Sequence, residues 1–508
     1  MEDKLPESVD VIVLGTGLPE AILASACARA GLSVLHLDRN EYYGGEWSSF
    51  TMSMVHEVQE RPSTKLSEED RKRIGELVSE GETLVELGNR EVMDEIEMSW
   101  IDEKIKAKLE EQGQMRRFSI DLVPKVLLSK GSMVQTLCDS QVSHYAEFKL
   151  VNRQLCPTPR PSDSSQDSER IELNSVPCSK GEIFQSKALS ILEKRALVKF
   201  IQFSTEWHGK SDSERREILG KHADLPFSEF LSERDVKDPL QSFIINTIGI
   251  LGPRPTAMTG MLASCDFMDS VGHFGPSPFL FPLYGCGELS QCFCRLAAVF
   301  GSLYCLGRPV QAILKNKDGD VVGVIANGER INCRHVIMSA RFVPEDVPIV
   351  ENQKTERRVY ATEKSIKTAE KEQLTLINIA PLRPEAAVSR IVEVGFEACT
   401  APKGHFLVHA TGTLEGETGI ETVVERILEQ NDVHPYWKMS FTANSLKFDT
   451  AHLPGNVLVA PPIDSSLHYS SIIDECREMF CSTWPELDFL PRAIKNEEEN
   501  EDASGEKE

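Results

Sequence analysis

The stretch VIVLGTGLPEAIL, residues 11–23, begins with an apolar segment that runs into Gly15 and Gly17 in the spacing G-x-G. A stretch of small residues, AILASACARAG, and a second apolar stretch, LSVLHLD, follow it. In a strand–turn–helix nucleotide site the first glycine permits the tight turn, and the second lets the backbone approach a pyrophosphate. This order predicts a βαβ unit of the Rossmann type and an α/β fold.

The part of the motif that would hold a cofactor is damaged, because Glu20 stands where a third glycine is expected. A carboxylate in the first helical turn competes with a phosphate for the positive end of the helix dipole. Asp38, at the end of the second predicted strand, stands where an acid that binds a ribose would lie. We therefore predict that Gly15, Gly17 and Asp38 are remnants of a nucleotide site and that the chain binds no cofactor.

Composition narrows the class of protein. With 508 residues the chain is long enough for two or more domains, and its net charge of −24 argues against binding to nucleic acid. Thirteen scattered cysteines indicate reduced thiols, and the charged start MEDKLPESVD is unlike a signal peptide. The apolar runs fall short of the ~20 residues that span a membrane. We expect a cytoplasmic protein of the cytosol.

Changes in polarity predict the domain organisation. Residues 1–177 form the first part of a large domain, and they include a charge-rich, partly helical or disordered insertion at 56–116. Residues 178–272 show apolar positions at helical spacing and predict a helical domain. Residues 273–490 return to the large domain, and 491–508 form an acidic, disordered tail.

Local turn chemistry adds detail within these parts. Asp318-Gly319 and Asn327-Gly328 lie between apolar runs and predict two hairpins. The polar, proline-rich stretch at 157–170 predicts a loop.

Residue patterns of known catalytic sites are absent from the sequence, which has no G-x-S-x-G, no phosphate-binding P-loop and no H-E-x-x-H. Cys292 and Cys294 lie on a predicted helix with their thiols on different faces, so we expect buried thiols and no metal site. These features favour a binding protein over an enzyme.

Two polar-aromatic clusters are candidates for a contact surface. EYYGGEW, residues 41–47, places Tyr42, Tyr43 and Trp47 around two glycines. In YGCGELSQCFCRL, Glu288 and Arg295 are seven residues apart and share one helix face. From the residues alone, these clusters are either a solvated charge pattern or a protein-contact face.

The blocks DVIVLGTGLPE, VLHLDRNEYYGGEW, SIDLVPKVLLSKG, YAEFK and PLYGCGELSQCFCRLAAVFGSLYCL resemble the Rab GDP-dissociation inhibitor and Rab escort protein superfamily. The resemblance spans residues 5–345 and continues more weakly to 490. It implies an FAD/NAD(P)-binding Rossmann-like flavoprotein scaffold without flavin and a smaller all-helical second domain. It also implies that Tyr43, Glu288 and Arg295 contact the switch regions of a GDP-bound Rab GTPase, with Leu303 and Cys305 completing that surface.

Within that superfamily, EIFQSKALSILEKR at 182–195 is similar to the escort proteins. The resemblance implies that Phe184 and Leu192 dock on the α-subunit of the Rab geranylgeranyltransferase α/β heterodimer; otherwise Phe184 belongs to the helix core. It further implies a non-catalytic chaperone that binds newly made GDP-bound Rab and presents it for prenylation. Such a chaperone then shields the geranylgeranyl chains until membrane delivery. The alternatives are a Rab GDP-dissociation inhibitor that recycles prenylated Rab and a flavin-dependent oxidase.

Overall fold

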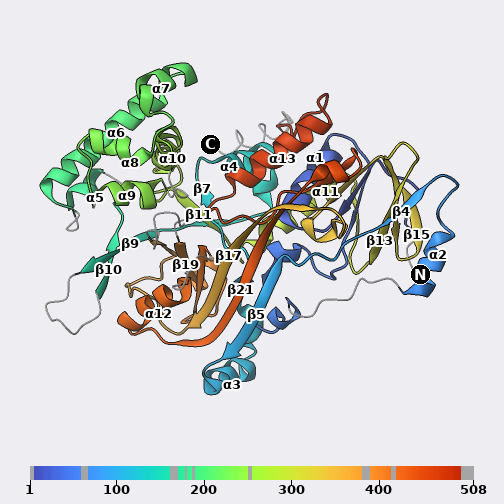
Figure 1. Cartoon of the computed structure of the whole chain (residues 1–508). Helices are drawn as coiled ribbons and strands as arrows, with labels where there is room; N and C mark the ends of the chain where they lie inside the picture. Colours follow the sequence, from blue (N-terminus) through green and yellow to red (C-terminus); the bar gives the residue numbers. More distant parts are fainter. Residues whose placement is uncertain are drawn as a thin grey trace, which may run out of the picture.

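The computed structural model describes residues 5–58, 67–160, 170–177, 180–185, 189–238, 240–249, 255–379, 389–413 and 419–492. Figure 1 shows their arrangement: two large sheets form the body, and a group of helices lies at one end. In the described ranges, no helix combines the length and apolar character required to cross a membrane.

A five-stranded parallel sheet contains the opening βαβ unit, with strand order β12-β2-β1-β16-β22. Its strands are β1 (Val11–Leu14), β2 (Val34–Leu37), β12 (Leu303–Cys305), β16 (His335–Met338) and β22 (Val457–Val459). Helix α1 (Leu18–Arg29) connects β1 to β2 and packs against α11 (Gly287–Val299) and α13 (Ser470–Thr483). All four residues of β1 are buried, so this sheet lies in the core, as the apolar run predicts.

An eight-stranded sheet forms the second layer, with order β10-β9-β18-β19-β20-β17-β21-β5. Its neighbouring strands are antiparallel except for β9 and β18. The strands are β5 (Met93–Trp100), β9 (Arg153–Arg160), β10 (Arg170–Ser175), β17 (Ile349–Thr362), β18 (Thr375–Ile379), β19 (Ser389–Gly395), β20 (Phe406–Thr413) and β21 (Pro435–Phe448). Helix α12 (Ile420–Gln430) packs on β17 and β20 (Figure 1).

Three smaller sheets complete the large part of the molecule, with orders β7-β11-β8, β15-β14-β13-β4 and β3-β6. Their strands are β3 (Ser49–Phe50), β4 (Thr83–Glu86), β6 (Ile120–Asp121), β7 (Leu127–Leu128), β8 (Phe148–Leu150), β11 (Phe279–Pro282), β13 (Val310–Lys315), β14 (Val321–Ala326) and β15 (Glu329–Asn332). Both predicted hairpins are present, one between β13 and β14 and the other between β14 and β15. Gly319, Asn327 and Gly328 adopt the positive φ angles that such turns require.

The described residues between Lys180 and Ser270 form helices, coloured green in Figure 1, and these pack on one another. They are α5 (Lys180–Gln185), α6 (Ile191–His208), α7 (Asp212–Leu219), a 3₁₀ turn (Gly220–His222), α8 (Phe227–Glu233), α9 (Leu240–Phe243), a π-helical turn (Ile244–Ile248) and α10 (Ala257–Ser270). Ser190 and Glu193 form a capping box that begins α6. The rings of Phe200, Phe227 and Phe230 pack together inside this group.

The segment 56–116 differs from the solvated insertion expected there. It contains α2 (Glu68–Gly75) and α3 (Glu103–Glu111), but it also supplies β4 and β5 to two sheets. In β5 an apolar residue recurs at every second position from Ile96, and the Trp100 ring stacks on Tyr436. This alternation is typical of an edge strand covered on one face, and the high charge of the segment conceals it.

Two other expectations differ from the structure or lie outside it. Residues 157–160 continue β9 rather than a loop. They pair with β10, beyond Leu155, where the pairing of β9 with β18 ends, so the two prolines need not donate to a second strand. Residues 161–169 and most of the expected acidic tail, 493–508, lie outside the described residues.

Candidate functional site

The turn after β1 is closed by the protein's own side chains. Glu20 is buried beside Gly17, where a Cβ would overlap its carboxylate and lie 3.0 Å from the Trp47 ring. Burial, followed by the charges of Glu46 and Asp38, raises the pKa of Glu20 well above its ordinary value. A pyrophosphate approaching Gly17 meets this acid, so the turn does not fit a dinucleotide.

Asp38 is engaged within the protein and is not open to a ribose. Its Oδ2 accepts hydrogen bonds from the Thr16 backbone N–H at 2.8 Å and from Thr16 Oγ1 at 2.6 Å. Thr16 Oγ1 in turn accepts from the Gly44 N–H at 2.9 Å. Because Tyr43 precedes Gly44, the remnant acid now positions the loop that carries this tyrosine.

The segment that carries Glu288 and Arg295 lies close against the same loop, and two glycines permit the close approach. At Gly285, with φ of +101°, a Cβ would lie 2.6 Å from Asp121 Oδ1. At Gly287, which begins α11, a Cβ would lie 2.5 Å from the backbone nitrogen of Ser49. Asp121 Oδ1 accepts from the Cys286 N–H at 2.8 Å, and Gly287 donates to Ser49 Oγ at 2.8 Å. This close fit places the start of α11 beside residues 41–49.

Tyr43, Glu288 and Arg295 line one surface hollow of about 290 Å³. Tyr43 comes from the loop after β2, and the other two come from the exposed face of α11, whose opposite face packs in the core. The structure therefore brings together three residues that the resemblance assigns to Rab binding. Tyr145 and Tyr304 also line this hollow, which we call the tyrosine hollow.

The tyrosine hollow combines aromatic surface with both signs of charge. The Arg295 guanidinium lies over the Tyr145 ring, 4.6 Å from its centroid. Partial burial raises the pKa of Glu288. Tyr43 is 36% exposed and its ring packs edge-on against Tyr304 at 5.8 Å. Aromatic rings together with an arginine are typical of protein-contact surfaces.

Leu303 and Cys305 do not line this hollow. Both lie in β12, one of the two edge strands of the parallel sheet, where Leu303 is 50% exposed. The intervening residue, Tyr304, points to the hollow, because alternate residues of a strand face opposite sides. Tyr145 and Tyr304 both lie in blocks that carry the family resemblance, YAEFK and FGSLYCL, but neither was assigned to the contact surface, because no local pattern relates them to Tyr43.

Phe184 and Leu192 are exposed, at 65% and 75% respectively. Phe184 is therefore not a core residue of its helix. Ile191 beside Leu192 is 70% exposed. Lys194 Nζ donates to the Phe184 carbonyl at 2.9 Å, which joins α5 to the first turn of α6. Three large apolar side chains thus face outward where these two helices meet, and we call them the α5–α6 patch.

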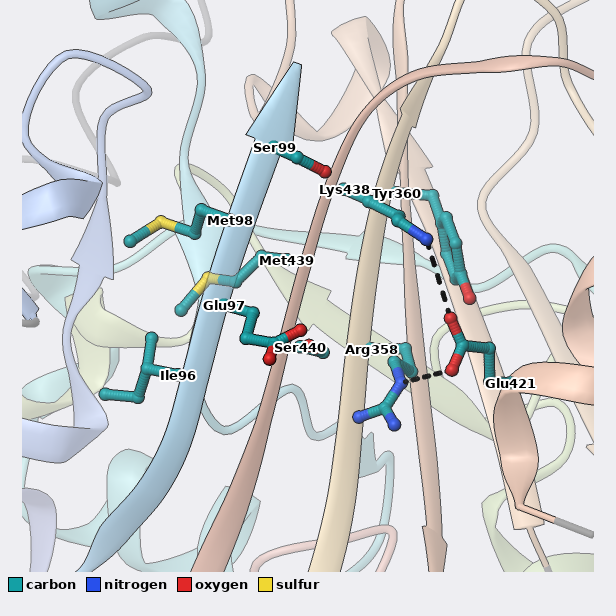
Figure 2. Close-up of a pocket in the computed structure, with 10 residues that line it drawn as sticks. All are labelled: Ile96, Glu97, Met98, Ser99, Arg358, Tyr360, Glu421, Lys438, Met439 and Ser440. Atoms are coloured by element: carbon teal, nitrogen blue, oxygen red, sulfur yellow. Dashed lines mark ion pairs between the residues drawn. The ribbon is translucent and has the colours of Figure 1, made fainter. Parts of the chain in front are cut away.

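A further hollow of about 490 Å³ lies between α12 and strands β17, β21 and β5 (Figure 2). Its cations are already paired: the Glu421 carboxylate lies 3.5 Å from Arg358 Nε and 3.7 Å from Lys438 Nζ. In the ranges that the structure describes, no group of three or more His, Cys, Asp or Glu side chains is arranged to hold a metal ion.

Comparison with known proteins gives the family. The model of the family described as GDP dissociation inhibitor matches residues 5–78 and 95–492. The chain belongs to the GDP dissociation inhibitor family. Residues 79–94, which the family model leaves unmatched, include β4 and the start of β5.

Individual relatives agree with this assignment. The chain is 72% identical to Rab proteins geranylgeranyltransferase component A 1 of Caenorhabditis elegans, over 98% of this chain and 97% of that protein. It is 30% identical to Rab proteins geranylgeranyltransferase component A of Drosophila melanogaster, over 98% and 93%. The crystal structure of Rab GDI from Plasmodium falciparum covers 95% of this chain and 100% of that one, with a TM-score of 0.73 and 20% identity. The predicted Rossmann-like scaffold is confirmed.

Proposed function

We propose that this protein is a Rab escort protein, a non-catalytic component of Rab geranylgeranylation in the cytosol. It binds a newly made, GDP-bound Rab at the tyrosine hollow and presents the C-terminus of the Rab to Rab geranylgeranyltransferase. It then shields the geranylgeranyl chains until they reach a membrane. The observation that carries the proposal is the convergence of Tyr43, Glu288 and Arg295 in one hollow, in a chain 72% identical to a component A protein.

The α5–α6 patch supports the transferase step. Phe184 and Leu192 are exposed on neighbouring elements, and apolar side chains held in water are costly unless a partner covers them. We propose that the α-subunit of the transferase covers them. The prenyl chain attached to a Rab must also be covered. Each exposed CH₂ group favours transfer into a membrane or an aggregate by about 0.8 kcal/mol.

A Rab GDP-dissociation inhibitor is the second candidate, since the family is named for that activity. It would use the same hollow but would not need the α5–α6 patch. The closing turn around Glu20 counts against a flavin-dependent oxidase, because the carboxylate occupies the approach to Gly17.

The test measures geranylgeranyl transfer by the purified transferase to an unprenylated, GDP-bound Rab, with and without this protein. We expect transfer to depend on the protein. Phe184→Ala should impair transfer while Rab binding persists, and Arg295→Ala should reduce both. Ile218→Ala serves as the control, because this exposed aliphatic side chain lies on α7 of the same helical segment.

Each result discriminates between the candidates. A protein that binds prenylated Rab but never supports transfer is a dissociation inhibitor. Transfer that is equally impaired by Ile218→Ala and Phe184→Ala would remove the specific role of the α5–α6 patch. Transfer that proceeds without the protein would overturn the escort function itself.

A further inference from the structure

Two arginines stand in one row on a face of the eight-stranded sheet. Arg357 of β17 and Arg390 of β19 both lie opposite Thr411 of β20, so the three side chains share a face. Both arginine side chains are buried, with 2% and 6% exposure. Neither takes part in the surfaces proposed above.

A loop at Asp464–Ser466 covers this row and accepts hydrogen bonds from three basic side chains. Arg357 Nη2 donates to the Asp464 carbonyl at 3.3 Å, and Arg390 Nη2 donates to the carbonyl of Ser465. The fully buried Lys125 donates to the Asp464 carboxylate and, at 2.7 Å, to the Ser466 carbonyl. Three buried cations therefore converge on one short loop.

The charges of this group do not balance. Asp464 is the carboxylate that contacts the loop cations, and Lys125 holds its pKa well below the ordinary value. The neighbouring His468 and His409 add no negative charge, and burial lowers the pKa of His468 to about 4. The backbone N–H of Asp121 donates to His409, and its Oδ1 bonds to Ser49 and the Cys286 N–H; among the described residues it forms no ion pair with the three cations. The three cations thus exceed the negative charge that contacts them.

The hydrogen bonds do not balance either. Arg357 Nε, Arg390 Nε and Arg390 Nη1 are buried and find no acceptor in the part of the chain that the structure describes. A buried guanidinium N–H without an acceptor costs about 1–3 kcal/mol or more, so native proteins supply a partner from water or an ion.

We propose that the two guanidiniums and the 464–466 loop form an internal binding site for a small monovalent anion of the halide class. Such an ion accepts several N–H bonds at once and offsets the excess positive charge. Water accepts the same bonds but leaves the charge uncompensated in a medium of low dielectric. The site fastens the loop before α13 to the eight-stranded sheet.

Bromide supplies the direct test, because it replaces chloride and scatters anomalously. Crystals of the full chain soaked in sodium bromide should show an anomalous peak within bonding distance of Arg357 and Arg390. In solution, the melting temperature should be higher in chloride than in methanesulfonate of equal ionic strength, by on the order of 2 °C. Arg390→Met should abolish this difference.

Arg358→Met is the matched control. Arg358 is the next residue of β17, so it faces the other side of the sheet, and its guanidinium lies 2.6 Å from Glu356 and 3.5 Å from Glu421. This variant should retain the chloride dependence. Water density without an anomalous peak, or equal melting temperatures in the two salts, would overturn the proposal. If Arg390→Met does not fold, the bromide experiment on the unmodified protein decides.

Discussion

The guanidinium of Arg295 lies over the ring of Tyr145, 4.6 Å from its centroid, although 150 residues separate the two in the chain. The contact holds the arginine in the lining of the tyrosine hollow, and no ion pair of the described residues involves Arg295. An arginine held in this way loses little conformational freedom when a partner binds.

Replacing this arginine should weaken Rab binding. We expect Arg295→Ala to raise the Kd for a GDP-bound Rab about tenfold or more, which corresponds to about 1.4 kcal/mol. Titration calorimetry measures the effect. Arg334→Ala, which removes an arginine with 79% side-chain exposure, should leave the Kd unchanged. Equal Kd values for all three proteins would exclude the tyrosine hollow as the Rab contact.

The α5–α6 patch should contribute to docking and not to stability. We expect Phe184→Ala to change the free energy of unfolding by less than about 0.5 kcal/mol, because its side chain is 65% exposed. Phe200→Ala should cost about 3–5 kcal/mol, because it empties a buried site in α6. Urea unfolding compares the two variants. A large loss of stability in Phe184→Ala would show that it acts as a core residue.

Glu20 should make stability depend on pH. Its folded-state pKa lies well above its ordinary value of 4.5, so the folded protein retains a proton that the unfolded chain releases. Compared with acid pH, where both states are protonated, the folded protein therefore loses stability as the pH rises above 4.5. We expect Glu20→Gln to match the original protein at about pH 4, where both states are protonated, and to be more stable at about pH 8, by on the order of 1–3 kcal/mol.

Urea unfolding at both pH values measures this difference. Glu329→Gln, which changes an exposed carboxylate, is the control and should show no such dependence. A constant difference between Glu20→Gln and the original protein across this range would show that Glu20 stays ionised and has a partner.

Asp38 should support the loop of Tyr43 rather than a nucleotide. Asp38→Ala deprives the Thr16 N–H and hydroxyl of their acceptor, so we expect a loss of about 2 kcal/mol in unfolding free energy and weaker Rab binding. Asp346→Ala, an exposed acid, should change neither quantity. Added FAD should leave the melting temperature of the original protein unchanged. A rise in melting temperature with FAD would show that the turn still binds a cofactor.

The sequence predicts the fold where local chemistry decides it. Gly15 and Gly17 indicate the βαβ unit, and Asn327-Gly328 permits a turn that few other residue pairs adopt. Strand β5 was missed because acids alternate with its apolar residues, and only pairing with β21 distinguishes it from a solvated segment. Tyr145 and Tyr304 were missed for a related reason, because packing between distant segments brings them to Tyr43.

The closed turn at Gly17 bears on the amount of this protein in the cell. Many proteins that bind a prosthetic group fold completely only when that group is supplied, so their abundance follows its biosynthesis. Here Glu20 and Trp47 fill the approach to the turn, and the Thr16–Asp38 bonds complete it from within. We expect this chain to accumulate equally in riboflavin-starved and riboflavin-fed cells.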